Sequence, residues 1–221
     1  MEITKLTVQV KNPDRINVFL DNKYAFSLDI TQIIDLAVKI GNKYDDEQIL
    51  QLKREGEFSK YYNKALAYSL TRPRSIGEIN DYLYKQTRTK TYLVKGECKE
   101  KAGMSANLSQ RIIDRLIEKG YLDNERFAKY WVENRNLKKG ISERVLRQEL
   151  AKKGINNETI QRTISESNRS DKYELKKVIA KRRHRYTDDK KFIKYLMSKG
   201  YQYSMIQETL SELASSEEAD S

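Results

Sequence analysis

The segment LAKKGI at residues 150–155 reappears as LMSKGY at residues 196–201, and this repetition defines the architecture. Each copy closes a helix-periodic stretch whose start carries a capping side chain, Ser142 in one copy and Thr187 in the other. The leucines lie 46 positions apart and the capping residues 45. A fixed period of this size indicates stacked helical repeats, in which neighbouring units bury apolar surface against one another.

An earlier copy of the unit precedes these two. Ser75 and Glu78 have the spacing of a capping box, and Leu83 takes the place of Leu150. The separation is here 67 positions instead of 46, so the first copy contains an insertion. We place this basic insertion near residues 84–107.

Each repeat is expected to hold three helices, at about residues 123–135, 142–153 and 156–167 in the middle copy. Apolar side chains recur on one face of each helix. The expected inner residues of the middle repeat are Phe127, Ala128, Trp131, Val132, Val145, Leu146, Leu150, Ile160 and Ile164. Those of the last helix of the first repeat are Leu108, Ile112, Ile113, Leu116 and Ile117. Those of the last repeat are Leu175, Val178, Ile179, Phe192, Ile193, Leu196, Met205, Ile206, Leu210 and Leu213.

The first thirty residues alternate with a period of two, which indicates strands rather than helices. The alternating sets are Leu6, Val8 and Val10, then Ile16, Val18 and Leu20, then Tyr24, Phe26 and Leu28. Turn-forming residues separate them at 12–14 and 21–23. Two capping pairs follow, Asp29 with Gln32 and Asp45 with Gln48, and Gly41 is expected to close the first helix.

The sequence therefore predicts a mainly α protein, in which tandem three-helix repeats form an elongated array after a small antiparallel β meander with one or two helices. The expected domains are residues 1–58 for the meander and its helices, 59–122, 123–168 and 169–213 for the three repeats, and 214–221 for an acidic disordered tail.

Composition excludes several classes of protein. With 2 prolines and 9 glycines in 221 residues, the chain is neither collagen-like nor a Pro/Gly-rich disordered protein. No stretch is apolar enough to span a membrane, and the first residues lack the pattern of a signal peptide, so we expect a cytoplasmic protein. Cys98 is the only cysteine, which rules out an internal disulfide and a zinc site built from several thiolates.

The formal net charge of +11 is unevenly distributed. Residues 1–58 carry eight basic and ten acidic side chains, so the positive excess lies in the remainder and favours a polyanionic partner or an acidic protein surface. Three clusters of cations are the candidate contact residues, although such runs are also typical of solvated helix faces. They are Arg72, Arg74, Arg88 and Lys90; Lys138, Lys139, Arg144 and Arg147; and Lys181, Arg182, Arg183, Arg185, Lys190 and Lys191.

The sequence has few residues that could form a catalytic or metal-binding site. His184 is the only histidine and lies among cations, which disfavours metal binding. No glycine-rich phosphate loop is present. We therefore expect no enzyme, no cofactor and no metal. Most of the 15 tyrosines are expected to pack against helices, while Tyr84, Tyr92 and Tyr186 are the best candidates for stacking on nucleic-acid bases.

Two groups of motifs resemble the RecX family of bacterial regulatory proteins. The first is Ala67 to Leu70, then Arg72 to Ser75, then Glu78. The second comprises Lys119 to Asp123, Phe127, Ala128, Trp131, Val132, Arg135, Lys139, Gly140, Leu146, Glu149, Leu150 and Lys153 to Ile155. The resemblance covers about residues 59–213, and the insertion after Leu83 departs from it.

The resemblance implies a regulator that binds RecA and its filament on single-stranded DNA, in the filament groove, and mainly inhibits recombinase, ATPase and coprotease activity. It also implies roles in DNA repair, homologous recombination and the SOS response. We expect a monomer, and direct weak binding to DNA stays open. The alternative is a sequence-tolerant nucleic-acid-binding helical repeat protein or a helix-turn-helix-like regulator.

Overall fold

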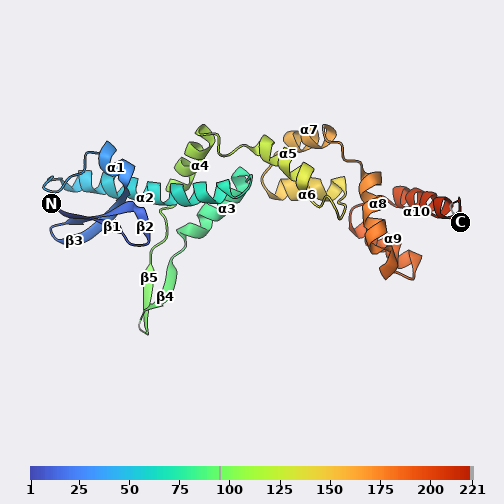
Figure 1. Ribbon diagram of the computed structural model, residues 1–221, viewed down its shortest axis with the longest axis horizontal. Coiled ribbons are helices and arrows are strands. Elements are labelled where there is room, and N and C mark those ends of the chain that lie inside the picture. Colours follow the sequence, from blue (N-terminus) through green and yellow to red (C-terminus); the bar gives the residue numbers. More distant parts are fainter. Residues whose placement is uncertain (95, 220–221) are drawn as a thin grey trace. The chain divides into compact units, whose positions relative to one another are not determined.

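A computed structural model, which describes residues 1–94 and 96–219, is mainly helical and begins with a small antiparallel sheet (Figure 1). The predicted fold class is confirmed in these respects. The chain divides into an N-terminal unit, Met1–Arg72 with Ile79–Leu122, and a C-terminal unit, Pro73–Glu78 with Asp123–Ser221. Helix α3 (Ile76–Thr87) contributes its first residues to the C-terminal unit and the rest to the N-terminal one.

The predicted meander is present as strands β1 (Ile3–Gln9), β2 (Asn12–Leu20) and β3 (Lys23–Asp29), paired antiparallel in that order. An irregularity in register between Ile3 and Lys5 brings Ile3 into the same buried cluster as Leu6, although strict alternation would separate them. Val8 and Val10 are exposed, because they lie beside the β1–β2 turn and outside this cluster.

Two helices follow the sheet, α1 (Ile30–Asp35) and α2 (Asp46–Leu70). The capping pair of α2 is confirmed: the Gln48 N–H donates to Asp45 over 2.7 Å, and the Asp45 N–H donates to Gln48 over 3.0 Å. The expected role of Gly41 is wrong. The first helix ends at Asp35, because Ala37 adopts a φ of 48° and the Val38 N–H bonds back to the Ile33 carbonyl, which closes the helix earlier.

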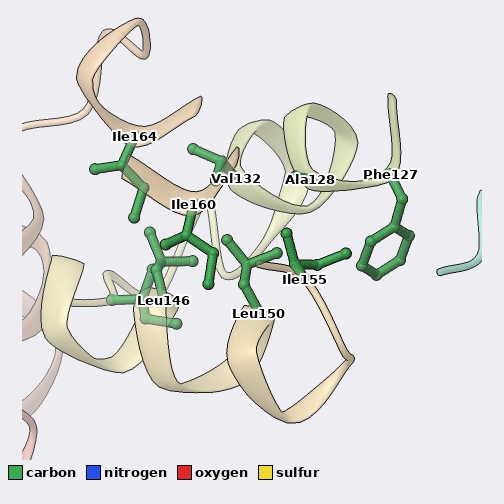
Figure 2. Packing of buried hydrophobic residues seen from close by; sticks show 9 residues of the cluster. Phe127, Ala128, Val132, Leu146, Leu150, Ile155, Ile160 and Ile164 are labelled. Carbon is green, nitrogen blue, oxygen red and sulfur yellow. The ribbon is translucent and has the colours of Figure 1, made fainter. Parts of the chain in front are cut away.

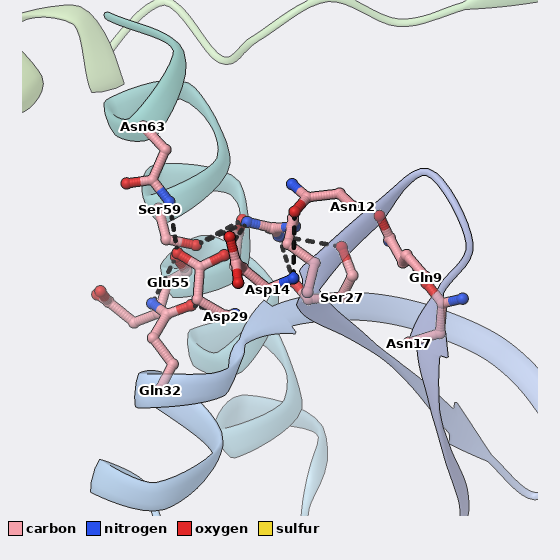
Figure 3. Close-up of polar contacts among 12 residues, drawn as sticks. Gln9, Asn12, Asp14, Asn17, Ser27, Asp29, Gln32, Glu55, Ser59 and Asn63 are labelled. Atoms are coloured by element: carbon pink, nitrogen blue, oxygen red, sulfur yellow. Dashed lines mark hydrogen bonds and ion pairs between the residues drawn. The ribbon is translucent and has the colours of Figure 1, made fainter. Parts of the chain in front are cut away.

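Buried Arg15 joins the sheet to α2. Figure 3 labels two of its partners, Asp29 of the sheet and Ser59 of α2. Its guanidinium donates to Asp29 over 2.6 Å, to the Ser59 hydroxyl over 3.1 Å and to the Gly56 carbonyl over 3.0 Å. Since Gly56 and Ser59 belong to one uninterrupted helix, the boundary that we expected after residue 58 falls inside α2. No proline or left-handed residue interrupts the helix at that point.

The expected insertion at 84–107 contains a two-stranded hairpin between α3 and α4 (Leu108–Glu118). Its strands are β4 (Lys90–Val94) and β5 (Glu97–Lys101), paired antiparallel. Four of the five expected inner residues of α4 are buried, whereas Ile117 is exposed.

The middle repeat forms as predicted, with helices α5 (Asn124–Asn134), α6 (Glu143–Lys152) and α7 (Asn157–Ser165). Asp123, Ser142 and Asn156 cap their first turns through side-chain oxygens. Figure 2 shows the core, in which Phe127, Leu146 and Leu150 pack with the residues expected from the sequence. Ile141 and Ile155 join this core, and Trp131 and Val145 pack at its edge.

The last repeat comprises α8 (Asp171–Arg182), the short 3-10 helix η1 (Arg183–Arg185), α9 (Asp189–Ser198) and α10 (Tyr203–Ala219). Its expected core forms, together with Tyr201. The cap of α9 is Asp188 and not Thr187, because the Asp188 carboxylate accepts the Lys190 and Lys191 N–H groups. Helix α10 extends into the segment 214–221 for which we expected disorder, and Asp220 and Ser221 lie outside the described residues.

Candidate functional site

Within the C-terminal unit, the same kind of hydrogen bond occurs at two places, each where the second helix of a repeat begins. The Ser142 hydroxyl donates to the Lys199 carbonyl over 2.7 Å, and the Ser75 hydroxyl donates to the Lys153 carbonyl over 2.8 Å. Both carbonyls close a helix of the following repeat, at the Lys-Gly pair of the repeated segment. The repeated sequence segment therefore makes the same contact each time, a hydrogen bond from the serine of the preceding repeat.

The contact between Ser142 and Lys199 forms one wall of a cleft of about 260 Å³ between α6, α8 and the end of α9. Four cations line the cleft: Lys139, Lys181, Arg182 and Lys199. None of its lining residues carries a carboxylate. We call this site the cationic cleft.

The charges of the cationic cleft are not neutralised within the described part of the chain. None of its four cations forms an ion pair with a described residue, whereas neighbouring cations do. Lys199 places its ammonium 5.3 Å from the ring centre of Tyr195, a cation–π contact that leaves the charge able to meet an anion. The cleft therefore offers several uncompensated positive charges to a ligand that carries phosphates or carboxylates.

Tyr201 also lines the cleft and is only 3% exposed. Its hydroxyl has no hydrogen-bond partner among the described residues. Burial raises the pKa of Tyr201 far above its ordinary value, and the nearby Asp171 and Glu174 raise it further. The hydroxyl thus stays neutral and keeps a proton that it can donate to an acceptor oxygen.

The remaining candidate cations of the C-terminal unit lie outside this cleft. Arg147 is bound to Glu143 over 2.6 Å, and Arg183 is bound to Asp189 over the same distance. Both are thereby partly neutralised by acids on their own or the next helix. The others are exposed at the surface without lining the cleft: Lys138, Arg144, Arg185, Lys190 and Lys191.

The candidates of the first cluster do not meet in one place. Arg72 and Arg74 are half-buried in the connection between α2 and α3. Arg88 and Lys90 lie at the base of the hairpin in the N-terminal unit and line a different, smaller pocket. The structure thus brings Lys139 of the second cluster together with Lys181 and Arg182 of the third.

Sequence reasoning missed three residues of the cationic cleft: Lys199, Tyr195 and Tyr201. A signal was present, because Lys199 and Tyr201 belong to the repeated segment at residues 196–201. The repetition by itself indicates only the end of a helix. Its carbonyl contact with Ser142 is what places the Lys199 side chain beside the cations of α8.

Other chemistry-bearing residues do not converge on a site. His184 is exposed in η1, and Cys98 is exposed on β5. Across residues 1–94 and 96–219, no group of three or more His, Cys, Asp or Glu side chains could hold a metal ion. None of the helices in that part of the chain has both the length and the apolar character needed to cross a bilayer.

Two family models match the chain. Residues 1–45 match the regulatory protein RecX N-terminal domain, and residues 123–164 match the second three-helix domain of RecX. The first match covers the meander and α1, and the second covers nearly all of the middle repeat.

Curated relatives carry the name regulatory protein RecX. The protein from Bacillus licheniformis is 30% identical over 217 residues, which is 95% of this chain and 76% of that protein. The protein from Bacillus subtilis is 32% identical over 163 residues, which is 74% of this chain but only 56% of that protein. The match therefore spans little more than half of the Bacillus subtilis relative.

Two solved structures share the fold. A crystal structure of regulatory protein RecX superposes with a TM-score of 0.65 at 22% identity, covering 94% of this chain and 98% of that one. The crystal structure of RecX from Lactobacillus salivarius gives a TM-score of 0.52 at 23% identity, covering 72% and 97%.

Proposed function

Because this chain belongs to the RecX family of regulatory proteins, we propose that it binds RecA and the RecA filament on single-stranded DNA. It lies in the filament groove and restrains the recombinase, ATPase and coprotease activities of RecA. It performs no chemistry of its own and acts as a cytoplasmic monomer in DNA repair, recombination and the SOS response.

The observation that carries this proposal is the cationic cleft. Lys139, Lys181 and Arg182 come from two repeats and face one cavity without a compensating carboxylate. An acidic protein surface satisfies such a group of charges well, since its carboxylates are held in place and lose little entropy on binding. Arginine adds a planar fork that binds a carboxylate through two parallel hydrogen bonds.

The repeated helical units support a partner that is a polymer of identical subunits. The Ser-to-carbonyl contact occurs at both Ser75 and Ser142, so equivalent helices begin at equivalent contacts. A protein built from repeats can meet successive subunits of a polymer with successive weak contacts. Linked contacts of this kind raise the overall affinity by orders of magnitude over that of one contact.

ATP hydrolysis by RecA on single-stranded DNA tests the proposal. Titration with this chain should lower the rate at concentrations at or below that of RecA, because one molecule bound in the groove restrains several subunits. A cleft variant that replaces Lys139 and Lys181 by Gln should require a higher concentration for the same inhibition. An unchanged hydrolysis rate at saturating chain would contradict the proposal.

A nucleic-acid-binding function is the second candidate, because phosphate fits the same cations as carboxylate. The two functions differ in their dependence on salt. Direct binding to DNA weakens steeply with salt through release of condensed counterions. Binding to a protein filament depends on salt less steeply when apolar contacts contribute to it.

A further inference from the structure

A second group of cations lies in the N-terminal unit, at the base of the hairpin. A pocket of about 60 Å³ is lined by Lys60, Lys64, Arg88, Lys90 and Lys101, together with Tyr61, Gln86, Ala102 and Gly103. Of these five cations, only Arg88 and Lys90 are among the candidates that the sequence indicates. We call the five cations the hairpin-base cluster.

The cluster is assembled from segments that are distant in the sequence. Lys60 and Lys64 are one turn apart on α2, so they share a face of that helix. Lys90 and Lys101 are partners in the β4–β5 register. The Met104 N–H donates to the Gln86 carbonyl over 2.8 Å, which holds the end of the hairpin against the end of α3.

This closure of the hairpin requires glycine at position 103. A Cβ atom on Gly103 would lie 2.2 Å from the Thr87 carbonyl oxygen, a distance that no side chain tolerates. The backbone after β5 therefore passes in direct contact with the end of α3. The end of β5 that carries Lys101 is therefore held against the end of α3, and Lys101 lines one pocket with the cations of α2.

The five cations lie close together around one pocket. None of the five forms an ion pair with a described residue. Burial lowers the pKa of Lys60, and Lys101 and Lys64 lower it further. Burial and the neighbouring Lys90 and Lys101 also lower the pKa of Lys64. The acid that opposes these effects at Lys60 is Glu57, which itself accepts the N–H and hydroxyl of Ser105 over 2.9 Å.

We propose that the hairpin-base cluster binds the phosphodiester backbone of single-stranded DNA. Five cations around a pocket of this size can surround one phosphate group and approach its neighbour along the strand. Binding relieves the mutual repulsion of the lysines, so the same charges that oppose one another in the free protein favour the complex. The cluster lies in the N-terminal unit and the cationic cleft in the C-terminal unit, so this proposal does not rest on the proposed function.

Exposed aromatic rings beside the cluster favour a nucleic-acid strand over an acidic protein. Tyr84 is 61% exposed, and the Arg88 guanidinium lies 5.4 Å from its ring centre. Tyr92 is 47% exposed and lies two positions from Lys90 on β4, hence on the same face of the strand. Unstacked bases pack on aromatic rings and guanidinium planes, whereas the carboxylates of an acidic peptide do not stack on aromatic rings.

Binding of a fluorescently labelled oligothymidine, measured by anisotropy over a series of salt concentrations without RecA, tests the proposal. The variant replaces Lys60, Lys64 and Lys101 by Gln. The control replaces Lys11, Lys23 and Lys39, which are exposed in the same unit, and removes the same charge. The slope of log affinity against log salt should become shallower by about 1 to 2 in the variant, since each single-strand phosphate contributes about 0.7. It should stay unchanged in the control.

Equal slopes in the variant and the control would overturn the proposal. So would a variant that still binds oligothymidine but no longer binds polyglutamate, because the cluster would then serve an acidic protein. A methylphosphonate oligothymidine, which keeps the bases and lacks the backbone charge, should bind the wild type and the variant alike. Melting followed by circular dichroism checks the fold, and Lys64→Gln alone, at an exposed position, should give a smaller change in the same direction.

Cys98 provides an independent readout, since it is the only cysteine and is exposed on β5. A photo-crosslinker attached to Cys98 should capture the oligothymidine in the wild type and lose most of that yield in the triple variant. A crosslinking yield that is equal in both proteins would place the strand elsewhere.

Discussion

The Trp131 indole N–H donates to the Glu149 carboxylate over 2.9 Å, and this bond joins α5 to α6 at the edge of the middle repeat's core. The same carboxylate receives two bonds from Arg135, over 2.8 Å and 2.9 Å. The Lys153 ammonium lies 4.2 Å from the centre of the Trp131 ring. Trp131 is thus a packing residue, as its position in the sequence predicts. Its indole N–H also binds the ion pair between Glu149 and Arg135.

Glu149 should make the stability of the protein sensitive to acid. Burial alone would raise its pKa, but the hydrogen bonds from Arg135 and Trp131 outweigh burial and hold the pKa below its ordinary value of 4.5. The stabilisation is therefore fully present above pH 4.5 and is lost as the pH falls through the lower, folded-state pKa. Urea unfolding of the wild type and Glu149→Gln should show a stability difference that shrinks below pH 4.5. A difference independent of pH would contradict this role.

Replacing Trp131 by Ala should lower the free energy of unfolding by about 3 kcal/mol, the low end for loss of a large aromatic side chain. The low end applies because the ring is only half-buried beside Phe127, at a centroid distance of 5.6 Å. Trp131→Phe keeps the ring contact and should cost about 1 kcal/mol for the lost hydrogen bond. Circular dichroism in urea measures both, and two equal losses would show that the ring contact is unimportant.

The contact between repeats should be sensitive to Ser142→Ala. The hydroxyl caps α6, accepting the Val145 N–H over 3.3 Å, and donates to the Lys199 carbonyl over 2.7 Å. Loss of a cap costs about 1 kcal/mol, and leaving the Lys199 carbonyl without its donor adds a comparable amount. We therefore expect the free energy of unfolding to fall by about 2 kcal/mol. Ser165→Ala, at an exposed hydroxyl that bonds only within its own helix, is the control. Chemical denaturation should show a larger loss of stability for Ser142→Ala than for Ser165→Ala. Equal small losses would contradict the role of Ser142 as both a cap and a donor to the next repeat.

The cationic cleft should matter for the partner and little for folding. Lys139→Gln with Lys181→Gln should weaken binding to RecA-coated strands about tenfold or more, since each rim or cleft charge contributes a few kcal/mol at most. The control pair, Lys152→Gln with Lys194→Gln, removes the same charge from exposed positions outside the cleft. Anisotropy titrations compare the two pairs, and equal weakening would mean that total charge alone decides the affinity.

The local parts of the fold follow from the sequence because their determinants are local. The caps at Asp45, Ser75 and Ser142 and the apolar face of α5 depend on residues within one or two helical turns. Helix ends were less predictable: Ala37 closes α1 although Gly41 has the more favourable residue type. There, the tertiary burial of Val38 decides over intrinsic preference.

The sites depend on contacts between distant segments, which spacing along one chain does not reveal. Lys60 and Lys101 share a pocket only because the hairpin closes against the end of α3. Lys199 joins Lys139 only because its carbonyl accepts from Ser142. A run of cations in the sequence shows where charge accumulates, whereas the fold decides which of those charges face one another and which, like Arg147, meet an acid.

The affinity of the wild-type chain for RecA-coated and for bare single-stranded DNA, measured side by side at physiological salt, tests the central proposal most directly. If the chain is a regulator of the filament, it should bind coated strands much more tightly than either bare strands or free RecA. Equal affinity for coated and bare strands would contradict the account and leave a nucleic-acid-binding protein in its place.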